Sequence, residues 1–162
     1  MSTWIEIGGD AFTFSAAHAG IHGGQMEPLH GHTFAVTASL LGSRDRAGMI
    51  VDFHLVKRGL RAAIEPLRRR TLMPAEPVAG TCHIEDGQII VECGDRWYSF
   101  PQDDVALLPI PNTTTEALAG YLLGRLLPYL KDSAGLERVE LTLAEAADTR
   151  ASVTADHGEG LW

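Results

Sequence analysis

The stretch that decides the fold is 29-LHGHTFAVTASLLG-42, in which two histidines are followed by a regular alternation of apolar and polar residues. The apolar members of this alternation are Phe34, Val36, Ala38 and Leu40. Successive side chains of a β-strand point to opposite faces of a sheet, so the pattern predicts a half-buried strand over residues 32–42. One face of this strand must therefore pack against a second layer.

Two other parts of the chain show the same two-residue period. Residues 3–18, TWIEIGGDAFTFSAAH, alternate on either side of a Gly-Gly pair and predict a long, bent first strand that ends at His18. Near the other end, residues 136–145, LERVELTLAE, predict a strand, and residues 151–155 are its expected partner. These segments are the candidates for a sheet around residues 32–42.

Two segments have helical spacing instead. The stretch that follows GMIVDF carries an apolar stripe, made of Val56, Leu60, Ala63, Ile64 and Leu67. This predicted helix ends in three arginines, residues 68–70. The second helix is expected to begin at a capping box formed by Thr113 and Glu116, and Pro128 is expected to end or kink it.

Residues 71–111 have a different character. The segment TLMPAEPVAG, residues 71–80, predicts a proline-rich loop. Asp-Gly and Gly-Asp pairs then separate three short stretches that predict a three-stranded meander. The three stretches are CHIE, QIIVEC and RWYSFP, at residues 82–85, 88–93 and 96–101.

The predicted order of elements is strand, strand, helix, inserted hairpins, helix, strand, strand. Runs of strands with single helices favour an α+β fold, in which helices cover one face of an antiparallel sheet. A length of 162 residues predicts a single domain with a sizeable core.

Composition excludes several classes of protein. Thirteen Lys and Arg against 21 Asp and Glu give a formal net charge of −8, which argues against a nucleic acid or an anionic membrane as partner. The first residues lack a signal-peptide pattern and no stretch is apolar enough to span a bilayer, so a cytoplasmic protein is expected. Two cysteines, Cys82 and Cys93, are too few for a disulfide framework or a thiolate zinc site.

Three of the seven histidines form the candidate site. His30 and His32 are two residues apart and project to one face of a strand, and His18 on a neighbouring strand can add a third imidazole. Three neutral imidazoles with an open fourth position are the ligand set of catalytic zinc. A chance His-x-His pair is the alternative. The other histidines are interpreted as surface residues: His22, His54, His83 and His157.

Five motifs follow one another along the chain: FTFSAAH at 12–18, LHGHTFAV at 29–36, GMIVDFHLVK at 48–57, TTTEAL at 113–118 and VELTLAEA at 139–146. In this order they resemble the family of 6-pyruvoyltetrahydropterin and 6-carboxytetrahydropterin synthases. The resemblance covers nearly the whole chain except an insert at about 74–110. It implies the tunnelling fold (T-fold), an antiparallel four-stranded sheet with two helices on one face. It also implies trimers that close a barrel and pair into hexamers.

The resemblance assigns roles to specific residues. It implies zinc ligands at His18, His30 and His32. It implies a pterin anchor at Glu145, because a carboxylate accepts paired hydrogen bonds from the guanidine-like edge of a pterin. The segment Thr114, Thr115 and Glu116 is expected to assist, although helix capping is an equally good role for Glu116.

One departure from the family concerns the base. The carboxytetrahydropterin branch has a Cys four residues before the first His of His-Gly-His, and this chain has Met26 there, whose thioether accepts no proton at neutral pH. The next residue, Glu27, resembles a third class of the family, which is held to cleave 7,8-dihydroneopterin triphosphate to 6-hydroxymethyl-7,8-dihydropterin. Glu27 is therefore the candidate general base, and a solvated loop glutamate is the alternative.

A second departure concerns the Asp-His pair that the family carries after the first helix. Arg68 and Arg69 stand there, and a guanidinium cannot act as a base. Either His83 or Asp86 of the insert replaces the relay, or the protein binds a pterin without turnover. Arg69 is a candidate for gripping the substrate's triphosphate, with a helix-dipole role as the alternative. The leading hypothesis remains a zinc-dependent carbon-carbon lyase, with carboxy- or pyruvoyl-tetrahydropterin synthesis as runner-up and a metal carrier as a distant third.

Overall fold

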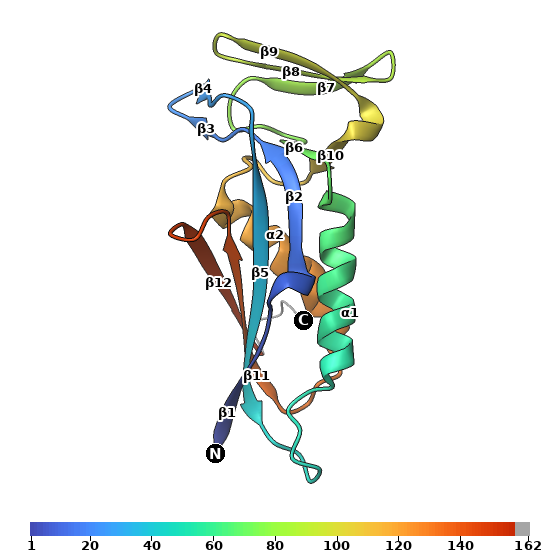
Figure 1. The fold of residues 1–162 in the computed structure, drawn as a ribbon, viewed down its shortest axis with the longest axis vertical. Coiled ribbons are helices and arrows are strands. Elements are labelled where there is room, and N and C mark those ends of the chain that lie inside the picture. Colours follow the sequence, from blue (N-terminus) through green and yellow to red (C-terminus); the bar gives the residue numbers. More distant parts are fainter. Residues whose placement is uncertain (158–162) are drawn as a thin grey trace.

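The long strand β5 (His30–Ser43) is the centre of the sheet in the computed structural model, which describes residues 1–157 (Figure 1). Strands β1 (Ser2–Ile7) and β2 (Thr13–His18) pair antiparallel with successive halves of β5. They are the predicted bent first strand, divided by a short 3₁₀ turn. On the other side of β5 lies β11 (Leu136–Ala144), followed by β12 (Arg150–Asp156), so the four-stranded antiparallel sheet is present as predicted.

Two short strands extend this sheet and make it mixed. Strand β6 (Thr71–Pro74) pairs parallel with β2 and with β10 (Val105–Leu108). The predicted loop over residues 71–80 was therefore wrong for its first four residues, which form β6. A four-residue strand shows too little alternation to be recognised, and the proline that suggested a loop is its last residue. A further hairpin that the sequence did not predict is formed by β3 (Ile21–His22) and β4 (Gln25–Met26).

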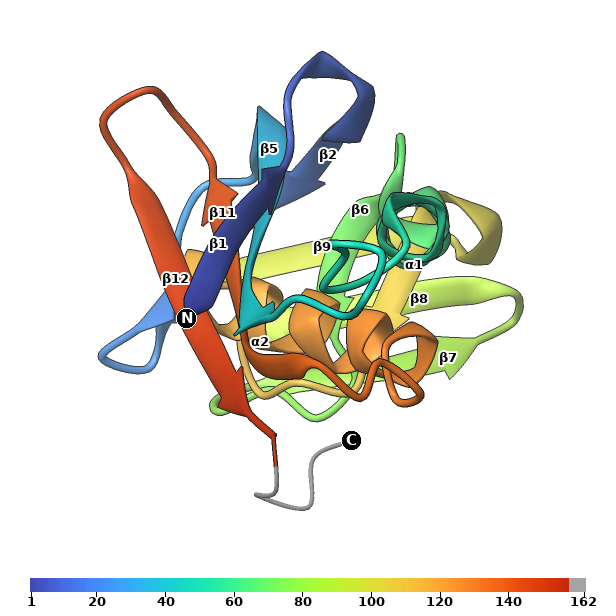
Figure 2. The ribbon, with the colours of Figure 1, turned by 90° about the horizontal axis from the view of Figure 1, so that it is seen from below.

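Helices α1 (Phe53–Ile64) and α2 (Thr115–Leu126) lie together on one face of the sheet (Figure 2). Each continues into a 3₁₀ turn that contains a proline, at Glu65–Leu67 and Leu127–Tyr129. No helix among residues 1–157 is long and apolar enough to cross a membrane.

The start of α2 differs from the prediction by one residue. Its N-cap is Thr114, whose hydroxyl accepts a hydrogen bond from the Ala117 N–H at 3.3 Å. The expected cap, Thr113, is fully buried and donates its hydroxyl to the Ala19 carbonyl instead. Three consecutive threonines offer three similar caps, and only the tertiary contact distinguishes them.

The main core lies between the two helices and the sheet. Phe14 and Phe34 stack at 5.1 Å between ring centroids, and Leu40, Leu60 and Leu122 are fully buried. The apolar face of β5 thus packs as its alternation predicts.

Replacing Leu40 with alanine is expected to lower the free energy of unfolding by about 3 kcal/mol, because a fully buried leucine loses its contacts and leaves a cavity. Urea unfolding of the two proteins measures the change. Val78→Ala, at a side chain that is 65% exposed, is the control and is expected to change stability by less than about 0.5 kcal/mol. A loss below about 1 kcal/mol for Leu40→Ala would contradict the packing described.

The meander is present where the sequence predicts it, across one end of the main sheet (Figure 1). Its strands are β7 (Thr81–Glu85), β8 (Gln88–Cys93) and β9 (Arg96–Pro101). One face of the meander forms a second apolar cluster with the β3–β4 hairpin. The cluster comprises Ala19, Ile21, Met26, Met73, Ile89, Val91 and Cys93.

Candidate functional site

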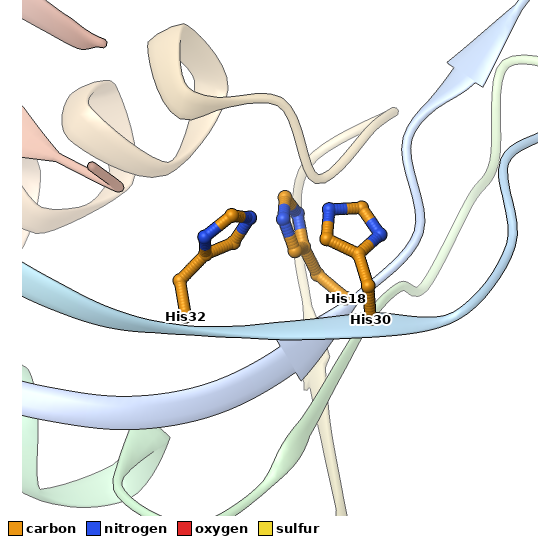
Figure 3. A group of neighbouring side chains, drawn as sticks. All are labelled: His18, His30 and His32. Carbon is orange, nitrogen blue, oxygen red and sulfur yellow. The ribbon is translucent and has the colours of Figure 1, made fainter. Parts of the chain in front are cut away.

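The pairing of β2 with β5 brings the three histidines together. His18 lies directly opposite His30, and Ala16 lies opposite His32, so all three imidazoles project from the same face (Figure 3). One ligand nitrogen from each ring lies within 4.8 Å of the other two. This is the convergence that the sequence predicts from strand parity.

Backbone carbonyls orient two of the rings. The His18 Nδ1 is 2.7 Å from the Thr113 carbonyl oxygen, and the His30 Nδ1 is 2.8 Å from that of Pro28. A carbonyl accepts only from an N–H, so these contacts place the proton on Nδ1 and leave Nε2 with a free lone pair. The His18 Nε2 is buried and makes no hydrogen bond to the described residues. An orphaned acceptor that faces two other imidazoles fits a divalent metal ion.

The pKa of His18 is lowered from its ordinary value, mainly because burial disfavours the imidazolium. The neighbouring rings of His30 and His32 lower this pKa further, while the Thr113 carbonyl and the Glu145 carboxylate act in the opposite direction. A lowered pKa keeps the ring neutral near pH 7, which is the form that binds a metal.

The histidines line a cavity of about 640 Å³. Its walls come from the β2–β5 connection, the start of α2 and the β11–β12 turn. Besides the three histidines, the lining side chains include every other predicted site residue except Arg69: Glu27, Thr114, Thr115, Glu116 and Glu145. The structure therefore brings the candidate metal ligands and the predicted pterin-binding residues into one cavity.

Glu145 is held at the end of β11 by a residue of α2. The Thr115 hydroxyl donates a hydrogen bond to the Glu145 Oε2 at 2.5 Å, and both side chains line the cavity. This bond fixes the orientation of the carboxylate. Glu116 is exposed in the first turn of α2, where its negative charge also stabilises the helix by interacting with the positive end of the helix dipole.

Glu27 faces the cavity from the segment that follows β4. Its Oε1 is 3.3 Å from the Nε2 of His22, and its Oε2 accepts the N–H of Gly20 at 3.3 Å. A Cβ at Gly20 would lie 3.0 Å from that oxygen, so glycine leaves room for the carboxylate. His22 was predicted to be a surface residue; it is exposed but also lines the cavity. Only the unpredicted β3–β4 hairpin places it beside Glu27.

Arg69 is not among the residues that line this cavity. Its backbone has φ 59° and its N–H donates to the Ser15 carbonyl at 2.7 Å, which ties it to the edge of β2. It borders a separate hollow together with Ser15 and Thr33, whose side chains alternate with those of the histidine face. Arg68 pairs with Glu65 at 3.4 Å.

His83 and Asp86 of the insert are the two candidates for a replacement proton relay. Neither is among the described residues that line the cavity. His83 instead lies 3.6 Å from Glu85 on the same strand. Among residues 1–157, the cavity-lining residue with a permanent positive charge is Arg150, at the start of β12. The sequence did not single it out, because one arginine after a turn has no distinguishing pattern.

The protein is thus an α+β protein in which a mixed sheet, backed by two helices, carries a cavity lined by three histidines that could hold a metal ion. The sequence model of the family described as "6-pyruvoyl tetrahydropterin synthase" matches residues 9–156. The chain therefore belongs to the 6-pyruvoyl tetrahydropterin synthase family, and its fold is the T-fold.

Individual relatives agree with this assignment. A Methanocaldococcus jannaschii protein named "Putative 6-carboxy-5,6,7,8-tetrahydropterin synthase" is 30% identical over 122 residues, which are 74% of each chain. The solved 6-pyruvoyl tetrahydropterin synthase of Plasmodium falciparum is 26% identical, with a TM-score of 0.90 over 96% of this chain and 98% of that one. The Plasmodium vivax enzyme is 26% identical, with a TM-score of 0.89 over 96% and 99%.

Proposed function

We propose that this protein is a zinc-dependent pterin lyase that cleaves the side chain of 7,8-dihydroneopterin triphosphate. The product would be a cleaved dihydropterin such as 6-hydroxymethyl-7,8-dihydropterin. The observation that carries the proposal is the meeting of three oriented imidazoles with the carboxylates of Glu27 and Glu145 in one cavity. Membership of a pterin synthase family supports the choice of substrate class.

Glu145 holds the pterin ring in this account. Its carboxylate accepts two hydrogen bonds from the N–H groups on the edge of the pterin, in the paired geometry of an arginine–carboxylate contact. The hydrogen bond from Thr115 keeps the carboxylate turned into the cavity before substrate arrives. Ring binding at Glu145 leaves the side chain of the pterin to extend toward the histidines.

His18, His30 and His32 hold the zinc ion. Three neutral nitrogen donors favour zinc and leave a coordination position open, as catalytic zinc sites require. When bound there, zinc supplies Lewis acidity to the hydroxyl groups of the pterin side chain.

Glu27 is the general base. It removes the proton from the hydroxyl on the second side-chain carbon, and the bond between the first and second carbons then breaks. The second carbon leaves as an aldehyde that carries the phosphates, while the electron pair of the broken bond is taken up by the conjugated ring. A proton is then returned to the first side-chain carbon, which gives the hydroxymethyl group. In the Plasmodium vivax enzyme, solved variants replace a catalytic glutamate by alanine or cysteine, which supports a glutamate in this role. His22 orients the Glu27 carboxylate.

The alternative is the synthesis of a 6-carboxy- or 6-pyruvoyl-tetrahydropterin. The names of the archaeal and Plasmodium relatives favour it. Met26 argues against the thiolate version of that chemistry, because its thioether is 4% exposed and belongs to the second apolar cluster. A pterin-binding protein without turnover is the remaining alternative.

The deciding experiment incubates zinc-loaded protein with 7,8-dihydroneopterin triphosphate and identifies products by mass spectrometry. Hydroxymethyldihydropterin supports the proposal. A carboxy- or pyruvoyl-tetrahydropterin as product would contradict the proposal and support the alternative reaction. Tight pterin binding in calorimetry without any product would assign a binding role.

Arg150 is expected to bind the triphosphate, in place of Arg69. It lines the cavity, and a guanidinium forms paired, charge-assisted hydrogen bonds with phosphate oxygens. Arg150→Ala should raise KM by about tenfold or more with kcat within about twofold, because the phosphates are remote from the bond that breaks. Arg125→Ala, an exposed arginine of α2 outside the cavity, is the control. An unchanged KM would remove Arg150 from the phosphate site.

We also propose that the chain forms trimers or hexamers. Within residues 1–157, the sheet ends in β10 and β1 on one side and in β12 on the other, and each of these strands has one edge without a partner strand. Unpaired edges of this kind are suited to pairing between copies. Light scattering of the purified protein tests this, and a monomer would contradict it.

A further inference from the structure

We infer that the meander β7–β8–β9 holds Glu27 at the cavity, and that Arg96 and Tyr98 are the positioning residues. The expected effect on turnover rests on the proposed function. The contacts between the meander and residues 24–29 do not depend on it. The near neighbours of the Glu27 carboxylate, His22 and Gly20, both belong to the same short hairpin region.

That hairpin cannot fix Glu27 alone. Strands β3 and β4 contain two residues each, and an isolated two-stranded hairpin is marginal in water even when longer. The side chain of Glu27 is also 41% exposed, so packing around the carboxylate does little to restrain it. Asn112 holds β3 from outside the hairpin through both backbone groups of Ile21, but a support at β4 and Glu27 must come from another element.

Two hydrogen bonds from β9 flank Glu27. The Arg96 Nε donates to the carbonyl oxygen of Met26 at 2.9 Å, immediately before Glu27. Two residues after Glu27, the Leu29 N–H donates to the Tyr98 hydroxyl at 3.4 Å. Both side chains are half-buried and lie on the same face of β9, turned toward the hairpin.

Apolar packing and a tight turn complete the contact. Met26 packs into the second apolar cluster with residues of β8, and the Cys93 thiol donates to the Gly24 carbonyl at 3.6 Å. At the β8–β9 turn, Gly94 has φ 63°, and a Cβ there would meet the end of the Gln25 side chain. The backbone of the β8–β9 turn thus lies against the side chain of Gln25 in β4.

The test uses Arg96→Ala and Tyr98→Phe, which remove one flanking hydrogen bond each, with Arg96→Lys as the conservative variant. Trp97→Ala is the control, since Trp97 lies between them on β9 but is 60% exposed on the opposite face. Amide hydrogen exchange over residues 24–29 is measured in the zinc-loaded full chain. Zinc content, melting temperature, kcat and KM are measured on the same proteins.

Arg96→Ala and Tyr98→Phe are expected to speed exchange over residues 24–29 by about tenfold, the effect of one lost hydrogen bond. With zinc content unchanged, kcat should fall by about tenfold while KM stays within about twofold, because a displaced base costs turnover rather than binding. Arg96→Lys should recover part of the loss, and Trp97→Ala should match the wild type.

Unchanged exchange in both variants would overturn the inference. So would faster exchange with full kcat in a protein whose wild type is active. A wild-type protein that turns over no pterin, but shows the expected exchange pattern, would overturn the proposed function and leave the meander as the support of this segment.

Discussion

His30→Ala is expected to lose its zinc and to lower kcat/KM by on the order of a thousandfold, since Lewis-acid stabilisation amounts to several kcal/mol. Two imidazoles remain in the variant, too few for a stable zinc site. The fold should be retained, because His30 is exposed and its ring lies against the Pro28 carbonyl and the rings of His18 and His32. Metal analysis and steady-state kinetics measure both effects.

The matched control for this prediction is His83→Ala. His83 is an exposed histidine on β7 that does not line the cavity, so its loss should leave zinc content and activity at wild-type values. If His30→Ala still carries one zinc per chain, the assignment of ligands is wrong. If it loses zinc but keeps its activity, the metal has no part in the reaction.

Glu27→Gln is expected to lower kcat by about a hundredfold to ten-thousandfold, the range found for loss of a general base. The amide keeps the size of the side chain and can still accept the hydrogen bond from the Gly20 N–H, but it takes up no proton. Zinc content and pterin affinity should therefore remain unchanged. Calorimetry with a pterin, alongside turnover measurements, separates the two quantities.

Glu76→Gln serves as the control, because Glu76 is an exposed loop glutamate outside the cavity. Activity within about fivefold of the wild type in Glu27→Gln would exclude Glu27 as the base. Loss of zinc in that variant would instead mean that Glu27 supports the metal site.

The three-histidine part of the site could be predicted because it depends on which face of a strand each residue occupies, and that face alternates from one residue to the next. The alternation after His32 fixes which face of β5 is apolar, and His30 and His32 fall on that same face. His18 ends a strand with the same parity, so antiparallel pairing is enough to bring the rings together. The α+β class follows from the order of elements for the same reason.

Other features depend on contacts between distant segments. His22 reaches Glu27 only through a hairpin of two-residue strands, which is too short to produce a recognisable pattern. Arg69 follows a helix, as the sequence indicates, but its backbone turns back to the edge of β2 and takes it away from the cavity. Arg150 and the N-cap Thr114 are likewise set by tertiary packing, which local propensity does not encode.

The most direct measurement is anomalous diffraction at the zinc edge from crystals of the zinc-loaded protein. The account predicts one peak per chain, at roughly 2.0–2.1 Å from a nitrogen of each of His18, His30 and His32, with a coordination position left for a ligand from solution. Absence of a peak at these rings, or a fourth ligand from the protein that closes the site, would contradict it.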